Sequence, residues 1–188
     1  MKKLLILLLI ILISPIIGGG YGILHDQLTY TISPEYYTKF KFYQFGLMVI
    51  GSETIFPNPR ILVSTVGFMA TWWMGLPIGF ILGLVGLRHQ NHKRMFVVTM
   101  KAVIITIIVT FITGLVGLTY GKLYLVRTGV SWYLPDNLID IDNFISVGSM
   151  HNFSYLGGLL GLIAGIIYSV KQRRKNNLQE NAFLEKKN

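Results

Sequence analysis

Two histidines and one aspartate are the residues of this chain best suited to metal binding or acid–base chemistry. His25 and Asp26 are adjacent, and both they and His151 stand where a long apolar run meets a polar segment. Two imidazoles and a carboxylate can ligate a divalent metal such as zinc or iron, or can form an acid–base pair. The wider candidate cluster at this interface comprises His25, Asp26, Glu35, Asp140, His151 and Ser154.

The same polar groups have a structural alternative. Such side chains also cap helix ends and hydrogen-bond one loop to another. No His-x-x-x-His or His-Glu-x-x-His spacing supports a metal site. The absence of cysteine excludes disulfides, thiolate catalysis and cysteine-ligated metal centres. The sequence leaves open a structural cluster and a metal or acid–base site at His25, Asp26 and His151, and it identifies no catalytic residue.

Membrane-spanning helices are predicted to position these residues. Hydrophobic residues make up 52% of the 188 residues, and charged residues only 13%. A helix needs about 20 apolar residues to cross the hydrocarbon core of a bilayer. Four runs reach this length, at about 4–24, 61–87, 95–120 and 152–170. The sequence therefore predicts an all-α four-transmembrane-helix bundle over residues 1–171, followed by a polar, frayed tail at 172–188.

The basic residues predict the orientation of these spans. Of 17 Lys and Arg residues, 12 lie in segments 2–3, 88–101 and 171–187, which flank the apolar runs. The loops at about 25–60 and 121–155 carry net charges of 0 and −1. The positive-inside rule then predicts a multi-pass protein of the bacterial inner (cytoplasmic) membrane with both termini cytoplasmic. The same clustering explains the net charge of +9 without nucleic acid as a partner.

The first apolar run has a second interpretation as a signal peptide. Lys2 and Lys3 would form its basic region and residues 4–13 its apolar region. No Ala-x-Ala-like cleavage site follows, and the apolar run continues through residues 16–20. We therefore favour an uncleaved span, whereas cleavage would leave three spans in the same orientation.

Glycines at every fourth position predict close packing of the second and fourth spans. Spans packed in lipid associate through small residues that allow close backbone approach. The packing residues are Gly75, Gly79, Gly83, Gly157, Gly161 and Gly165.

We also find no carboxylate in the interior of a predicted span, which argues against an ion-coupled carrier.

Each predicted outer loop contains an interfacial segment. Ser33-Pro34-Glu35 is a helix-start pattern, so a short helix is expected over about 34–45, after an extended segment at 28–32. Its aromatic residues and lysines suit the headgroup layer, although the alternation at 39–42 also allows a strand. In the second loop, a helix starting near Asp140 is expected to run into the fourth span.

Two motifs carry a resemblance to a known group of proteins. The run HDQLTYTISPEYYTKFKF at 25–42, together with HNFSYLGG at 151–158, resembles an uncharacterised family of small bacterial membrane proteins. The resemblance covers most of the chain and implies the same four-span layout. It implies no activity, cofactor or site residue.

Three functions are compatible with these patterns. The leading hypothesis is a non-catalytic assembly or accessory protein, acting as a homo-oligomer or with a membrane-protein partner. The second is a membrane-interface enzyme or metal-binding protein that uses His25, Asp26 and His151. The third is a small channel or carrier, for which the threonine stripe of the third span offers the only polar route. The lipid bilayer is the expected partner in each case.

Overall fold

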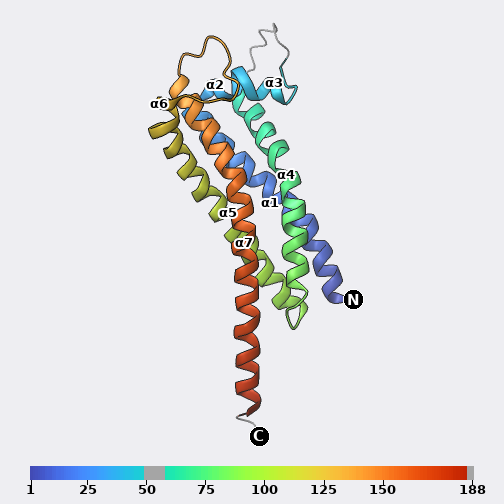
Figure 1. Cartoon of the computed structure of the whole chain (residues 1–188). Helices are drawn as coiled ribbons and strands as arrows, with labels where there is room; N and C mark the ends of the chain where they lie inside the picture. Colours follow the sequence, from blue (N-terminus) through green and yellow to red (C-terminus); the bar gives the residue numbers. More distant parts are fainter. Residues whose placement is uncertain (49–57, 186–188) are drawn as a thin grey trace.

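The structure is a computed structural model that describes residues 1–48 and 58–185, and these ranges are helical with no strand. Four long helices form the bundle: α1 (Lys2–Ile32), α4 (Pro59–Gly86), α5 (His92–Tyr120) and α7 (Ile141–Glu185) (Figure 1). Short segments connect them: α2 (Pro34–Tyr36), the π-helix η1 (Tyr37–Lys41), α3 (Phe42–Gln44), the π-helix η2 (Gly121–Leu125) and α6 (Val126–Thr128). Each long helix is long and apolar enough to cross a bilayer, and the chain is a multi-pass membrane protein.

The first helix is longer than predicted, and this changes the position of Asp26. Residues 28–32 were expected to be extended but continue α1 to Ile32. Thr29 and Thr31 donate their hydroxyls to carbonyls four residues earlier in this last part of the helix. Asp26 therefore lies within the last third of α1 rather than in a loop after the helix.

The last helix is also longer than its predicted span. It begins at Ile141, close to the start expected near Asp140. The carboxylate of Asp140 accepts a hydrogen bond from the backbone N–H of Asn143 at 3.0 Å, as a residue at a helix start commonly does. At its other end α7 continues to Glu185, so the tail predicted to be frayed at 172–188 is helical over its described part.

Glycines bring α1 and α4 into backbone contact. A Cβ placed on Gly22 would lie 2.0 Å from the carbonyl oxygen of Gly67. The predicted packing glycines of α4 continue this contact, because a Cβ on Gly75 or Gly79 would lie 2.3 Å from an atom of Ser14. A side chain larger than hydrogen therefore does not fit between these two helices.

The helices α5 and α7 form a second close pair. A Cβ on Gly161 would lie 2.5 Å from the carbonyl oxygen of Thr106, and Gly157 and Gly165 lie equally against α5. The Thr106 hydroxyl also donates to the carbonyl of Gly161 at 3.1 Å. The bundle is thus two tight helix pairs, α1 with α4 and α5 with α7, and both predicted glycine stripes contact helices of the same chain.

An aromatic cap covers the end of the bundle that carries Ile32 and Ile141, here called the site end. The segment 34–44 is helical, as expected, rather than a strand. Figure 1 shows this segment across the ends of the long helices. Its buried side chains form one core cluster with α4 and α7: Tyr36, Tyr37, Phe42, Val63, Val66, Phe144 and Val147.

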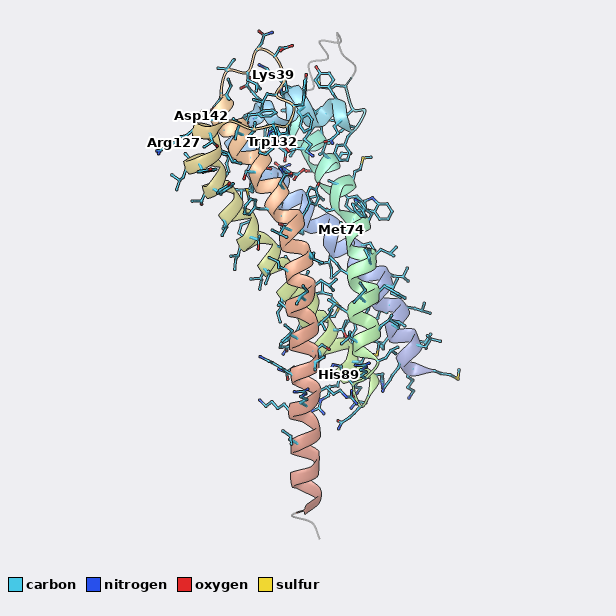
Figure 2. The ribbon with its side chains drawn as sticks, viewed as in Figure 1. Lys39, Met74, His89, Arg127, Trp132 and Asp142 are labelled. Carbon is cyan, nitrogen blue, oxygen red and sulfur yellow. The ribbon has the colours of Figure 1, made fainter. Side chains whose placement is uncertain are left out.

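Lys3 and His89 form the side-chain contacts of the opposite end, called the basic end, and Figure 2 shows the position of His89 there. The Lys3 ammonium donates to the carbonyls of Leu87 and His89. The buried His89 ring places Nε2 3.0 Å from the hydroxyl of Ser169 in α7. Burial lowers the pKa of His89, and the positive charges of Arg173, Arg94 and Lys3 lower it further. This histidine ties the turn between α4 and α5 to α7.

Candidate functional site

The candidate site lies beneath the aromatic cap, where α1 meets α7. His25 and Asp26 come from the last third of α1, and His151 comes from the first third of α7. Their exposed fractions are 5%, 2% and 7%. The structure therefore brings together, and buries, the three residues that the sequence suggested for a metal or acid–base site.

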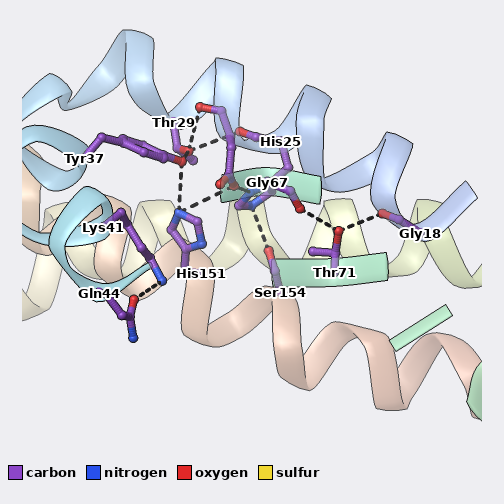
Figure 3. A network of polar contacts seen from close by, with 11 residues as sticks. Gly18, His25, Thr29, Tyr37, Lys41, Gln44, Gly67, Thr71, His151 and Ser154 are labelled. Atoms are coloured by element: carbon purple, nitrogen blue, oxygen red, sulfur yellow. Dashed lines mark hydrogen bonds and ion pairs between the residues drawn. The ribbon is translucent and has the colours of Figure 1, made fainter. Parts of the chain in front are cut away.

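The two imidazoles lie close to the Asp26 carboxylate, and Figure 3 shows how His25 and His151 approach each other. His25 Nδ1 lies 3.1 Å from Asp26 Oδ1, and His151 Nε2 lies 4.0 Å from the same oxygen. The two imidazole rings meet edge to face with centroids 4.8 Å apart. One nitrogen or oxygen from each residue lies within 4.8 Å of the other two. Such a cluster is compact enough to surround a single cation.

Hydrogen bonds fix the orientation of both imidazoles. His25 Nε2 lies 3.1 Å from the Ser154 hydroxyl, so α7 holds the ring that α1 contributes. The Tyr37 hydroxyl lies 2.6 Å from the Thr29 hydroxyl and 3.5 Å from His151 Nε2. The candidate Ser154 is therefore a direct neighbour of the three-residue cluster, as Figure 3 shows.

Two polar atoms at the site are buried without a hydrogen-bond partner among the described residues: Asp26 Oδ2 and the Tyr21 hydroxyl. Leaving a buried carboxylate oxygen unpaired is costly, because its interaction with water is lost and not replaced. Asp26 Oδ2 is therefore available to accept a hydrogen bond or to ligate a cation.

The aromatic cap seals the site from the loop side. The Tyr36 ring stacks on the His151 ring, with centroids 5.0 Å apart and planes at 19°. Tyr36 also contacts Phe144 of α7, which is itself buried. Because these rings cover the imidazole, bulk water has little access to the cluster through the cap.

A buried lysine lies next to the cluster. Lys41 is 6% exposed, and its ammonium donates to the side-chain oxygen of Gln44 at 2.9 Å (Figure 3). Burial lowers the pKa of Lys41, whereas the charge of Asp26 raises it. Lys41 also acts electrostatically on His151. The site therefore combines one carboxylate with one nearby cationic side chain.

Glu35 and Asp140, which the sequence placed in the wider cluster, do not belong to this three-residue group. The Glu35 carboxylate accepts hydrogen bonds from the backbone N–H groups of Ile139 and Asp140 and pairs with Lys39 at 2.6 Å. Asp140 starts α7, as described above. Both residues connect the two loops, which is the structural role that the sequence analysis left open.

The Glu35 contact gives a prediction for the loop connection. Lys39, together with the N–H groups of Asp140 and Ile139, lowers the pKa of Glu35 to about 2. The ionised Glu35 carboxylate therefore stabilises the folded loop connection. This contribution to folding stability is complete above the ordinary carboxyl pKa of 4.5 and is lost as the pH falls towards 2. We expect Glu35→Gln to raise amide exchange at Ile139 and Asp140 about fivefold at neutral pH. Unchanged exchange at these two amides would contradict the assignment.

A cavity of about 90 Å³ extends from the site into the bundle. All four long helices contribute to its wall, and Tyr21, His25, Asp26, His151 and Ser154 lie at one end of it. From there its lining continues past Gly158 along the seam between the two helix pairs to Ser14 and Ile78. The candidate site is thus the polar end of an elongated, mainly apolar cavity.

Sequence reasoning did not identify Tyr21, Thr29, Tyr37 and Lys41 as parts of the site. The relevant signal was helical spacing: Tyr21, His25 and Thr29 recur every four residues and so share one face of a continued α1. Because residues 28–32 were expected to be extended, this face was not recognised.

Comparison of the chain with protein families, curated proteins and solved structures finds no match.

Proposed function

We propose that this membrane protein binds a divalent transition-metal ion, with zinc the best fit, through His25, Asp26 and His151. The proposal depends on one observation: three metal-ligating side chains converge in a buried site where Asp26 Oδ2 has no partner among the described residues. A bound cation would satisfy this oxygen. Burial of the same carboxylate without such a partner would be destabilising.

The donor set fits zinc, and its three ligand atoms lie within 4.8 Å of one another. Zinc takes nitrogen and oxygen ligands at about 2.0–2.2 Å, so neighbouring ligand atoms of a tetrahedral site lie about 3.4 Å apart. The observed separations from Asp26 Oδ1 are 3.1 Å to His25 Nδ1 and 4.0 Å to His151 Nε2. With Nδ1 ligating, His25 Nε2–H donates to the Ser154 hydroxyl, the kind of outer contact that orients a metal-binding histidine.

Three protein ligands leave the fourth tetrahedral position open, as in catalytic zinc sites. A zinc ion bound there would polarise a substrate oxygen or lower the pKa of a bound water to about 7. The Tyr37 hydroxyl lies 3.5 Å from His151 Nε2, and the Lys41 side chain lies near the same ring (Figure 3). These groups would orient or neutralise an oxygen-bearing ligand.

Metal analysis of the purified full chain tests the proposal. We expect about one zinc per chain after exchange into metal-free detergent buffer, and loss of at least about 100-fold in affinity for His151→Gln. His89→Gln is the matched control. It also removes a buried histidine, which bonds Ser169 at the basic end, away from the proposed metal site. A natural chain with no more metal than His151→Gln would contradict the proposal.

A second candidate function follows from the hydrogen-bond order Asp26–His25–Ser154. Asp26 Oδ1 faces His25 Nδ1, and His25 Nε2 faces Ser154 Oγ, each at 3.1 Å. This connectivity matches an aspartate–histidine–serine relay. In such a relay the serine oxygen adds to an acyl carbonyl carbon while its proton passes to the imidazole, which gives that proton to the leaving group as its bond to the acyl carbon breaks. Fluorophosphonate labelling of Ser154 that is lost in His25→Gln would favour this function. Stoichiometric zinc without labelling would exclude it in favour of the metal site.

The remaining sequence predictions accompany this proposal. The basic segments support cytoplasmic termini and an outward-facing site in a bacterial inner membrane. The resemblance to the four-span bacterial family supports the same layout. A homo-oligomer or a membrane-protein partner stays a prediction, and the glycine stripes no longer support it specifically because they contact helices of the same chain.

A further inference from the structure

The residues of α1 that line the cavity cover about the thickness of one membrane leaflet. Its lining residues in α1 run from Asp26 to Ser14, which is about 18 Å of helix at 1.5 Å per residue. Half of a bilayer's hydrocarbon core is about 15 Å thick. The lined part of α1 is therefore long enough to accompany one acyl chain across a leaflet.

The wall of the cavity below the polar cluster is chemically apolar, although threonines and a serine contribute to it. The Thr106 hydroxyl donates to carbonyls of Ala102 and Gly161, and Thr110 donates to the Thr106 carbonyl. Ser14 likewise donates to the Ile10 carbonyl. These hydroxyl protons are already engaged with backbone, so the lower cavity suits hydrocarbon better than water or ions.

The cavity also reaches the surface that faces lipid. It lies in the seam between the two helix pairs, where residues from all four helices meet. Tyr155, which lines it, is 44% exposed, whereas Val103, deeper in the wall, is 4% exposed. A chain can therefore enter from the bilayer beside Tyr155 and come to lie against Val103.

We infer that the cavity binds an acyl chain of a membrane glycerophospholipid, whose phosphate head group lies at the His25–Asp26–His151 site. The acyl part follows from the length, lining and lateral opening of the cavity. The head-group part rests on the proposed metal function. A divalent cation beside Asp26, together with the Lys41 ammonium near His151 (Figure 3), leaves the site with excess positive charge, which an anionic phosphate would balance.

Photocrosslinking with a defined lipid tests the acyl part. The full chain is reconstituted into vesicles of phosphatidylethanolamine and phosphatidylglycerol with a trace of phosphatidylglycerol that carries a diazirine in one acyl chain. After irradiation, peptide mapping compares labelling at buried Val103 with labelling at exposed Leu12, which reports contact with bulk lipid. We expect clear labelling at both positions in the natural chain.

Gly158→Leu should block the cavity. Gly158 lines it, and the nearest side-chain atom to a Cβ there is Met74 Cε at 4.0 Å, so a larger side chain enters open space. A leucine that displaces two lipid methylenes should lower Val103 labelling about tenfold. Gly20→Leu is the matched control, because a Cβ on Gly20 meets nothing within 4 Å and Gly20 does not line the cavity.

The outcomes separate the acyl chain from the metal. Unchanged Val103 labelling in Gly158→Leu, or Val103 labelling that is absent from the natural chain, would overturn the acyl site. Ala70→Leu, which enlarges another lining residue, should repeat the loss if Gly158→Leu does not fold. Zinc content is measured on the same samples, so the metal proposal can fail while the acyl site stands, or the reverse.

A second probe tests the head-group part. Diacylglycerol with the same diazirine chain lacks the phosphate, so it should label Val103 less than phosphatidylglycerol does. The difference should disappear in His151→Gln, which lacks a metal ligand. Equal labelling of the natural chain by both probes would overturn the assignment of the phosphate to the site.

Discussion

Gly22→Ala is expected to separate α1 from α4 and to lower the unfolding temperature by about 10 °C. The added methyl would lie 2.0 Å from the Gly67 carbonyl oxygen and 2.1 Å from the Thr71 hydroxyl. Overpacking a core costs about 1–3 kcal/mol when side chains can move aside, and backbone cannot move without parting the helices. We therefore expect a loss of about 3 kcal/mol, which converts to about that shift in temperature.

Gly20→Ala is the control for this substitution. Gly20 is also within α1, but a Cβ there meets nothing within 4 Å. Alanine favours helix over glycine by up to about 1 kcal/mol, so this variant should be at least as stable as the natural chain. Thermal unfolding of both variants in the same detergent decides the matter. Equal behaviour of Gly22→Ala and Gly20→Ala would show that the α1–α4 contact is not as close as described.

Asp26→Asn is expected to change stability in opposite directions with and without metal. Without metal, the natural chain keeps a buried carboxylate oxygen that has no partner among the described residues. Asparagine removes that charge, so the variant should unfold at an equal or higher temperature than the natural chain. With zinc at 100 times its dissociation constant, the natural chain gains about 2.7 kcal/mol, or about 5–10 °C, and the variant gains little.

Unfolding of the two proteins is measured in chelator and then in buffered zinc. The opposite signs of the two changes are informative, because a general loss of packing would lower the unfolding temperature of Asp26→Asn both with and without zinc. His89→Gln should keep the full zinc-dependent gain, since His89 lies at the basic end. Zinc stabilisation of Asp26→Asn as large as that of the natural chain would mean that the metal binds elsewhere.

The four spans could be predicted from the sequence because their signal is local. An apolar run of sufficient length identifies a spanning helix, and Pro34 and Asp140 mark helix starts by their own chemistry. The boundary of α1 was less predictable. The segment 28–32 contains three β-branched residues, which favour strand locally, yet continuation of the helix buries Thr29 next to Tyr37. Tertiary contacts decided this boundary.

The site was also predictable in part, because the position of its three main residues along the chain is a local signal. His25, Asp26 and His151 stood at apolar boundaries, so their common depth could be expected from span positions alone. The partners that orient them could not, because Ser154 reaches His25 only through the way α1 meets α7. The cavity was also beyond the sequence, since it depends on the separation between two helix pairs that each pack closely.

X-ray absorption at the zinc edge, on the zinc-loaded full chain, tests the central claim most directly. A metal held by His25, Asp26 and His151 predicts two imidazole nitrogens and at least one oxygen at about 2.0–2.2 Å, in four-coordinate geometry. The multiple-scattering pattern of imidazole should weaken in His151→Gln and persist in His89→Gln. An oxygen-only shell, or an imidazole signal that His151→Gln leaves intact, would contradict the claim.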